Sequence, residues 1–177
     1  MHLFYKGFSA IELLTVLLVA GIVLSLSVPS FGKNLARSRQ SAEINALFHA
    51  LYLARKESIR RKTRVSLCPS QDGSACAPGR DWSRGWILFE NTDRDEPPVN
   101  DPGEPVILVH SGGQHVRIEA NRHGFTSRGT RQRATNGTLI FCDAAGRIPA
   151  RALVISYTGR PRVADTRRGG ETYACSG

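Results

Sequence analysis

The chain has 177 residues, 41% of them hydrophobic, and its 24 Lys and Arg against 15 Asp and Glu give a formal net charge of +9. About 140 residues remain after an apolar N-terminal segment, enough for one domain with a core of its own. The charge favours polyanionic partners, either nucleic acid or anionic lipid. The sequence holds no hydrolase elbow, phosphate-binding loop or metal-binding His pair, so we expect no enzyme, no cofactor and no metal.

Residues 11–28 form an almost unbroken apolar run in which Glu12 is the one ionisable side chain. A run of this length is enough to span a bilayer as a helix, and a carboxylate inside it costs roughly 2.5–3.5 kcal/mol on insertion scales. Gly7 is the candidate cleavage site, and it precedes the apolar run, whereas a secretory signal is cut after its apolar core. Cleavage at Gly7 therefore leaves the apolar helix on the mature protein.

The string GFSAIELLTVLLV, residues 7–19, resembles the class III signal of type IV pilins and type II secretion pseudopilins. The resemblance implies that a prepilin peptidase cuts after Gly7 and methylates Phe8, and that Glu12 pairs with the terminal amine of a neighbouring subunit. It predicts a leader over 1–7 and a transmembrane and assembly helix over 8–29. The alternative is a plain transmembrane anchor that tolerates Glu12.

The resemblance also implies a location. The subunit is first a single-pass protein of the bacterial inner membrane with its C-terminal domain in the periplasm, and is later extracellular in the pilus. One observation conflicts, because Lys6 precedes the apolar run whereas Lys33, Arg37 and Arg39 follow it. The positive-inside rule places the larger basic cluster in the cytoplasm. The resemblance and the cysteines favour the opposite orientation, which we adopt.

After Pro29, apolar residues recur at spacings of three and four, and no glycine interrupts residues 33–64. This pattern predicts one helix from about Ser9 to Ile59, with an amphipathic continuation over 30–64. Beyond it, short β-rich runs alternate with turn residues. The predicted strands are 64–67, 86–89, 106–109, 116–119, 138–142 and 152–156, followed by an extended segment at 160–163.

These elements predict an α+β fold in which the long helix packs on one or two antiparallel sheets. The segments 67–89 and 153–162 resemble the GspH-type pseudopilin domain, the branch that includes the FimU and FimT minor pilins. The resemblance implies a GspH-like, β-rich globular domain over 65–177.

Four cysteines, at positions 68, 76, 142 and 175, allow three disulfide pairings. An even number outside the cytoplasm favours disulfides. We favour Cys68–Cys76, which closes a short loop, and Cys142–Cys175, which ties the C-terminus to a strand. A four-Cys zinc site is the alternative, but the sequence has no Cys-x-x-Cys pair.

Arginine outnumbers lysine twenty to four. The guanidinium group matches phosphate oxygens well, but a GC-rich genome also raises the arginine content. The positions of the arginines are therefore more informative than their number. Residues 33–64 and 117–177 each carry a net charge of +7, whereas residues 65–116 carry −5.

The strongest functional signal of the globular part is Gly159-Arg160-Pro161-Arg162. In an extended chain Arg160 and Arg162 point to the same side about 6.6 Å apart, a spacing that suits successive phosphates. Pro161 donates no backbone hydrogen bond, which confines the segment to a sheet edge or a loop.

This Gly-Arg-x-Arg string resembles the motif associated with DNA binding in FimT-type minor pilins of naturally competent bacteria. The resemblance implies that Arg160 and Arg162 are phosphate ligands and that Gly159 allows close backbone approach. The alternative is a solvated basic turn that keeps the domain soluble or pairs with the acidic part of a neighbour. Further candidates come from this sequence alone: Arg167 and Arg168 and, more weakly, Arg147 and Arg151.

An acidic run over 93–96, followed by Asn100 and Asp101, only loosely suggests a calcium loop. It lacks the EF-hand spacing and central glycine, and two prolines interrupt it. We interpret it as an exposed acidic loop.

The histidines at positions 49, 110, 115 and 123 have no carboxylate or cysteine at ligand spacing, and we interpret them as surface or packing residues.

Two functional hypotheses result. The first is a FimT-like minor pilin of a type IV pilus that binds DNA non-specifically through phosphate contacts, for DNA uptake in natural transformation. The second is a structural minor pilin or type II secretion pseudopilin that primes or caps the filament without binding DNA. The expected partners are DNA, other pilins, prepilin peptidase and, before assembly, the inner membrane.

Overall fold

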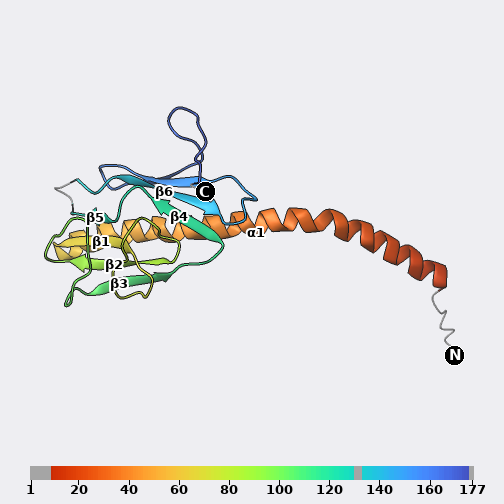
Figure 1. The fold of residues 1–177 in the computed structure, drawn as a ribbon, viewed down its shortest axis with the longest axis horizontal. Coiled ribbons are helices and arrows are strands. Elements are labelled where there is room, and N and C mark those ends of the chain that lie inside the picture. Colours follow the sequence, from red (N-terminus) through yellow and green to blue (C-terminus); the bar gives the residue numbers. More distant parts are fainter. Residues whose placement is uncertain (1–8, 130–132, 176–177) are drawn as a thin grey trace, which may run out of the picture. The chain divides into compact units, whose positions relative to one another are not determined.

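The computed structural model describes residues 9–129 and 133–175, without the side chains of 24–30 (Figure 1). The chain divides into two compact units, Met1–Leu35 and Ala36–Gly177. The elements are α1 (Ala10–Arg61), β1 (Arg64–Pro69), β2 (Gly85–Asn91), β3 (Val106–Ser111), β4 (Val116–Ala120), β5 (Phe125–Ser127), β6 (Gly137–Asp143), β7 (Arg151–Ile155) and β8 (Pro161–Ala164).

Helix α1 begins after Ser9, whose carbonyl oxygen accepts hydrogen bonds from the backbone N–H groups of Glu12 and Leu13. From Ala36 onward its buried positions recur every three or four residues, which gives the single apolar stripe that the sequence predicts. The helix ends at Arg61, and the next residue, Lys62, has a φ of 57° that stops the helical hydrogen bonding. The predicted helix is thus confirmed to within two residues at each end.

Among the residues whose side chains are described, no helical stretch has both the length and the apolar character that crossing a bilayer requires. Residues 1–8 and the side chains of 24–30 lie outside the described residues. The membrane segment over 8–29 therefore stays a prediction.

The strands form two four-stranded antiparallel sheets, with strand orders β3-β2-β1-β5 and β4-β6-β7-β8. Every predicted strand is present, and the extended segment at 160–163 forms β8 at one edge of the second sheet. The sequence did not predict β5, a strand of three residues that pairs with β1. The α+β prediction is confirmed.

The core lies in the second unit, between the apolar stripe of α1 and the inner faces of both sheets. Burying one large apolar side chain, such as Leu, Ile or Phe, stabilises a fold by roughly 1.5–3 kcal/mol relative to leaving it exposed. The largest fully buried side chains include Trp82, Trp86, Phe89, Phe141, Ile44, Leu47, Leu67, Leu139 and Leu153.

Two disulfides reinforce this unit, Cys68–Cys76 and Cys142–Cys175, which is the pairing favoured from the sequence. The first closes a loop directly after β1. The second joins β6 to the last described residue, so the segment that follows β8 is fixed at both ends.

Candidate nucleic-acid interface

Strands β7 and β8 form a hairpin whose turn contains the start of the Gly-Arg-Pro-Arg motif. The Ser156 backbone N–H donates to the Arg160 carbonyl at 3.2 Å, and the Gly159 N–H donates to the Ser156 carbonyl at 2.9 Å. Gly159 has a φ of +74°, which glycine adopts without steric cost. The turn itself therefore requires glycine at this position.

The two motif arginines flank a buried proline at the edge of the sheet. Pro161 pairs with Ile155 and Arg162 pairs with Val154, so β8 has β7 on one side only. Pro161 is buried, whereas Arg160 and Arg162 are exposed. This is the alternation expected of an extended segment, and it places both guanidinium groups on the outer side of the sheet.

A second, smaller hairpin follows β8 and carries the next two arginines. Thr166 forms a bridge with Thr172, and the Arg167 N–H donates to the Glu171 carbonyl at 2.7 Å. Figure 1 shows this loop at the violet end of the colour scale, projecting from the sheet. The Arg167 guanidinium carbon lies 5.7 Å from the centre of the Tyr173 ring, a cation–π arrangement.

Three of the predicted arginines line one hollow on the outer face of the β4-β6-β7-β8 sheet, which we call the arginine hollow. Its volume is about 480 Å³. Arg160 is not among its lining residues and lies in the turn directly before β8, two residues from Arg162. The lining residues are Glu119, Ala120, Asn121, Thr138, Ile140, Val154, Arg162, Arg167, Arg168 and Tyr173.

In the described part of the chain, the arginines at and beside the hollow have no acidic partner, unlike Arg60, Arg61, Arg64, Arg117, Arg128, Arg147 and Arg151. Within the described residues, none of Arg160, Arg162, Arg167 and Arg168 forms an ion pair. Each positive charge is therefore available to an anionic ligand.

The two weaker candidates have partners. Arg147 binds Asp143 at 2.7 Å, and its guanidinium group lowers the pKa of that carboxyl below the usual range. Arg151 binds Asp165, also at 2.7 Å. The structure therefore removes both from the set of unpaired arginines, a distinction that the sequence does not make.

The basic residues at the end of α1 are paired as well. Arg60 and Arg61 bind Glu57 at 2.6 and 2.8 Å and lower its pKa to about 2. Arg61 also binds Glu90 at 2.7 Å. We name these contacts, together with the 3.1 Å pair between Arg64 and Glu96, the helix-end ion pairs.

The acidic loop brings three carboxylates together, because ligand atoms of Asp93, Asp95 and Asp101 lie within 4.8 Å of one another. Burial raises the pKa of Asp95 and that of Asp101. Asp95 already accepts hydrogen bonds from the Asn91 side chain and from the Val99 N–H. These contacts explain the conformation of the loop, and we assign it no ligand.

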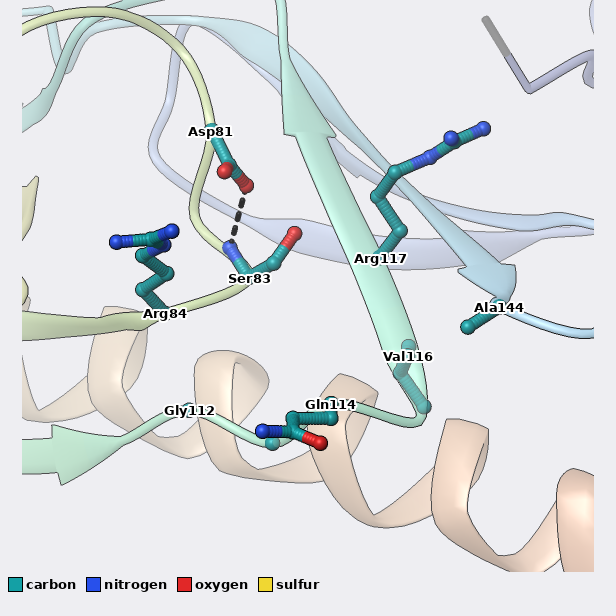
Figure 2. Close-up of a pocket in the computed structure, with 9 residues that line it drawn as sticks. Asp81, Ser83, Arg84, Gly112, Gln114, Val116, Arg117 and Ala144 are labelled. Carbon is teal, nitrogen blue, oxygen red and sulfur yellow. Dashed lines mark hydrogen bonds between the residues drawn. The ribbon is translucent and has the colours of Figure 1, made fainter. Parts of the chain in front are cut away.

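Figure 2 shows another hollow, of about 550 Å³, beside the start of β4. Arg84 and Arg117 lie on opposite sides of Ser83 in this view. Arg84 donates to the Gln71 side chain, and Arg117 pairs with Glu119 at 3.1 Å. The two arginines of this hollow are thus engaged by the protein itself, and it shares no arginine with the motif.

Two predicted sites belong to the first unit. Gly7 and Phe8 lie outside the described residues, and Glu12 is an exposed residue of the first turn of α1.

Among the histidines, His110 contacts Glu43 at 2.9 Å and stacks on Trp86 with ring centres 4.8 Å apart, which is a packing role. Its carboxylate partner is distant in the sequence, so ligand spacing did not reveal it.

Residues 43–159, about two-thirds of the chain, match the family model described as type II transport protein GspH. The chain belongs to the GspH family. The match ends at Gly159, so the GspH domain as matched stops where the motif arginines begin.

Two curated relatives are pilins by description. The pilin-like protein PilA1 of Thermus thermophilus is 28% identical over 168 residues, which cover 89% of this chain and 97% of PilA1. The type IV major pilin protein PilA of Myxococcus xanthus is 39% identical over 70 residues, 40% of this chain and 31% of that protein.

Among solved structures, the GspH-family chain is similar to the type IV minor pilin FimU of Pseudomonas aeruginosa. The TM-score is 0.50 at 19% identity, over 75% of this chain and 90% of FimU. At this identity the similarity concerns the fold alone. Together these findings place the chain in the GspH family, with a fold similar to that of FimU.

Proposed function

We propose that this chain is a non-enzymatic minor pilin that binds DNA non-specifically through its C-terminal arginines, for DNA uptake in natural transformation. The observation that carries the proposal is the set of unpaired arginines at the arginine hollow and along β8. Arg162, Arg167 and Arg168 line one hollow, and Arg160 is adjacent to it. Guanidinium groups without internal partners offer forked donors to phosphate oxygens.

The geometry favours backbone contacts over base readout. The arginines lie on a strand edge and on short hairpins, and none of the four belongs to a helix that could insert into a groove. Contacts to phosphate carry no sequence information directly. We therefore expect similar affinity for unrelated DNA sequences and a strong dependence on salt.

The test replaces both motif arginines, Arg160→Gln and Arg162→Gln, in the full chain held in a non-ionic detergent. Each lost phosphate contact reduces the slope of log affinity against log salt by about 0.9. We therefore expect weaker binding to every DNA sequence and a slope smaller by about two in a fluorescence anisotropy titration at several salt concentrations.

The matched control, Arg60→Gln with Arg61→Gln, removes the same formal charge from the helix-end ion pairs. These arginines already bind Glu57, so the salt slope should stay as in the wild type. If the two double variants reduce the slope equally, only net charge matters and the assignment to the motif is wrong.

The second candidate is a structural pilin or pseudopilin that primes or caps the filament. The description of the matching family, type II transport protein GspH, favours it. Edge strand β3 is also consistent with subunit contacts, because Val106, Leu108 and Val109 are exposed. In this case the chain would bind other pilins and would show no affinity for DNA at low salt.

For the first unit we propose processing and anchoring of the pilin kind. Prepilin peptidase would cut after Gly7 and methylate Phe8 at the inner membrane, and Glu12 would then pair with the amine of a neighbouring subunit in the filament. The apolar run with its single carboxylate supports this proposal. Mass spectrometry of the mature N-terminus tests it, because an unmodified chain that still begins at Met1 would refute it.

A further inference from the structure

An exposed aromatic ring occupies the tip of the hairpin that carries the motif. Tyr157 is 59% exposed and lies in the turn between β7 and β8. The guanidinium carbon of Arg133 is 5.8 Å from the centre of its ring. The ring contributes nothing to the core, so its position in the turn calls for another explanation.

The backbone beneath this ring is held by two neighbouring segments and by a contact within the turn. The Ala134 N–H donates to the Tyr157 carbonyl at 3.1 Å, and the Arg55 side chain donates to the Thr158 carbonyl. The hydroxyl groups of Ser156 and Thr158 are 2.8 Å apart. A ring presented on a fixed turn loses less entropy when it binds a ligand than one on a mobile loop.

The surroundings of the ring are cationic. Arg55 reaches the turn from α1, Arg133 lies over the ring, and Arg160 is the last residue of the turn, directly before β8. Within the described residues none of the three forms an ion pair with a carboxylate. An aromatic face bordered by unpaired arginines suits a ligand that carries flat bases and phosphates together.

We propose that this surface takes single-stranded nucleic acid, with one base stacked on Tyr157 while phosphates contact Arg160 and Arg162. The inference rests on the DNA binding proposed above. A strand that leaves the arginine hollow at Arg162 and follows β8 past Arg160 reaches the tip directly. The hollow contains a similar pair, Arg167 over Tyr173, at the other end of this path.

The aromatic ring selects for the single-stranded form. In a duplex the bases are stacked on one another and paired, so a side chain on the surface has no free base face to contact. Phosphates are present in both forms, and arginines alone would bind either. Tyr157 therefore adds affinity for one form only, without regard to sequence.

The experiment measures the affinity of the full chain, in non-ionic detergent, for an oligo-dT of about 16 nucleotides and for a duplex of similar length. Tyr157→Ala should weaken oligo-dT binding at least about fivefold, because stacking on an aromatic side chain is worth about 1–3 kcal/mol per base. Duplex binding should change less than about twofold. Tyr157→Phe keeps the ring and should bind oligo-dT as the wild type does.

The slope of log affinity against log salt distinguishes a loss of stacking from a loss of electrostatic contacts. Stacking releases no counterions, so Tyr157→Ala should leave the slope for oligo-dT unchanged. Thermal unfolding checks that the variant is folded. If the alanine variant unfolds, Tyr157→Leu is tested in its place, because leucine keeps apolar bulk without a ring. The same loss of oligo-dT affinity is expected.

The outcomes distinguish the two proposals. If Arg160→Gln with Arg162→Gln weakens both ligands while Tyr157→Ala weakens neither, DNA binding stands and the single-strand inference is wrong. The inference is also wrong if Tyr157→Ala weakens both ligands equally. If the arginine variant leaves both affinities unchanged, the proposed function itself fails.

Discussion

Residues 33–64 and residues 117–177 carry the same net charge, but the arginines at the end of the first stretch and those in the C-terminal part of the second differ in what they contact. At the end of α1, Arg60, Arg61 and Arg64 bind carboxylates from the helix, from β2 and from the acidic loop. Along β8 and the hairpin after it, the arginines bind no carboxylate among the described residues. The comparison teaches that net charge does not identify a binding surface. A positive charge that the fold leaves without a partner is the kind that can bind an external anion.

The largest expected effect concerns the disulfide of the C-terminal region. Replacing Cys142 and Cys175 with Ser should lower the free energy of unfolding by about 3 kcal/mol, because the bond closes a loop with a sequence separation of 33. DNA affinity should fall as well, since Arg167 and Arg168 lie in that loop. Chemical denaturation and a DNA titration of the same samples measure both effects.

The other disulfide provides the control. Cys68–Cys76 closes a loop with a separation of 8, so its removal should cost less stability. Its loop contributes no arginine to the hollow, and DNA affinity should not change. Equal losses of affinity in the two variants would show that the tether does not position the C-terminal arginines.

An intermediate effect concerns the helix-end ion pairs. The pKa of Glu57 is lowered from 4.5 to about 2 by Arg60 and Arg61, so its carboxylate stabilises the fold above pH 4.5 and this contribution is lost as the pH falls through 2. The wild type should therefore be more stable than Glu57→Gln at neutral pH, and the difference should shrink between pH 5 and pH 2. Thermal unfolding of both proteins across this range measures it.

Comparing the two proteins removes the other acids from the measurement. The pKa values of Asp95 and Asp101 are raised, so these groups act in the opposite direction, but they are present in both proteins and cancel. A difference that stays constant with pH would mean that the ion pairs do not stabilise the domain. The arginines at the end of α1 would then have no demonstrated role in stability to contrast with the unpaired arginines.

The smallest effect concerns Lys62, which follows the paired arginines. Its φ of 57° is a left-handed conformation that a side chain disfavours. Lys62→Gly should therefore raise the free energy of unfolding by about 1 kcal/mol. Thr63→Gly, where φ is not positive, should bring no gain. An equal gain from both would attribute the effect to lost side chains rather than to backbone conformation.

The sequence predicts what local patterns determine. Spacing of three and four residues is enough to place α1, and turn residues bound each predicted strand. The motif Arg160-Pro161-Arg162 is visible because a proline between two exposed arginines fits only a strand edge or a loop. Strand β5 was missed because it is short and is formed by pairing with β1, which is distant in the chain.

The availability of each arginine could not be predicted, because pairing depends on tertiary contacts. Nothing local indicates that Arg61 reaches Glu90 or that Arg64 reaches Glu96. The contact between Arg133 and Tyr157, which joins a loop to the hairpin turn, is also a tertiary contact and could not be predicted from local sequence. A tyrosine two residues before the Gly-Arg motif was the one signal that sequence inspection could have used.

Pro161 also determines how the domain meets other β-structure. The Arg160 carbonyl accepts from the N–H of Ser156, the residue after β7. Alternation along the strand therefore turns the backbone of Pro161 toward the open edge, and Pro161 has no N–H. An incoming strand would find an interrupted ladder there, whereas β3 keeps a donor at each position. Sheet extension through β8, the strand beside the arginines, is therefore disfavoured.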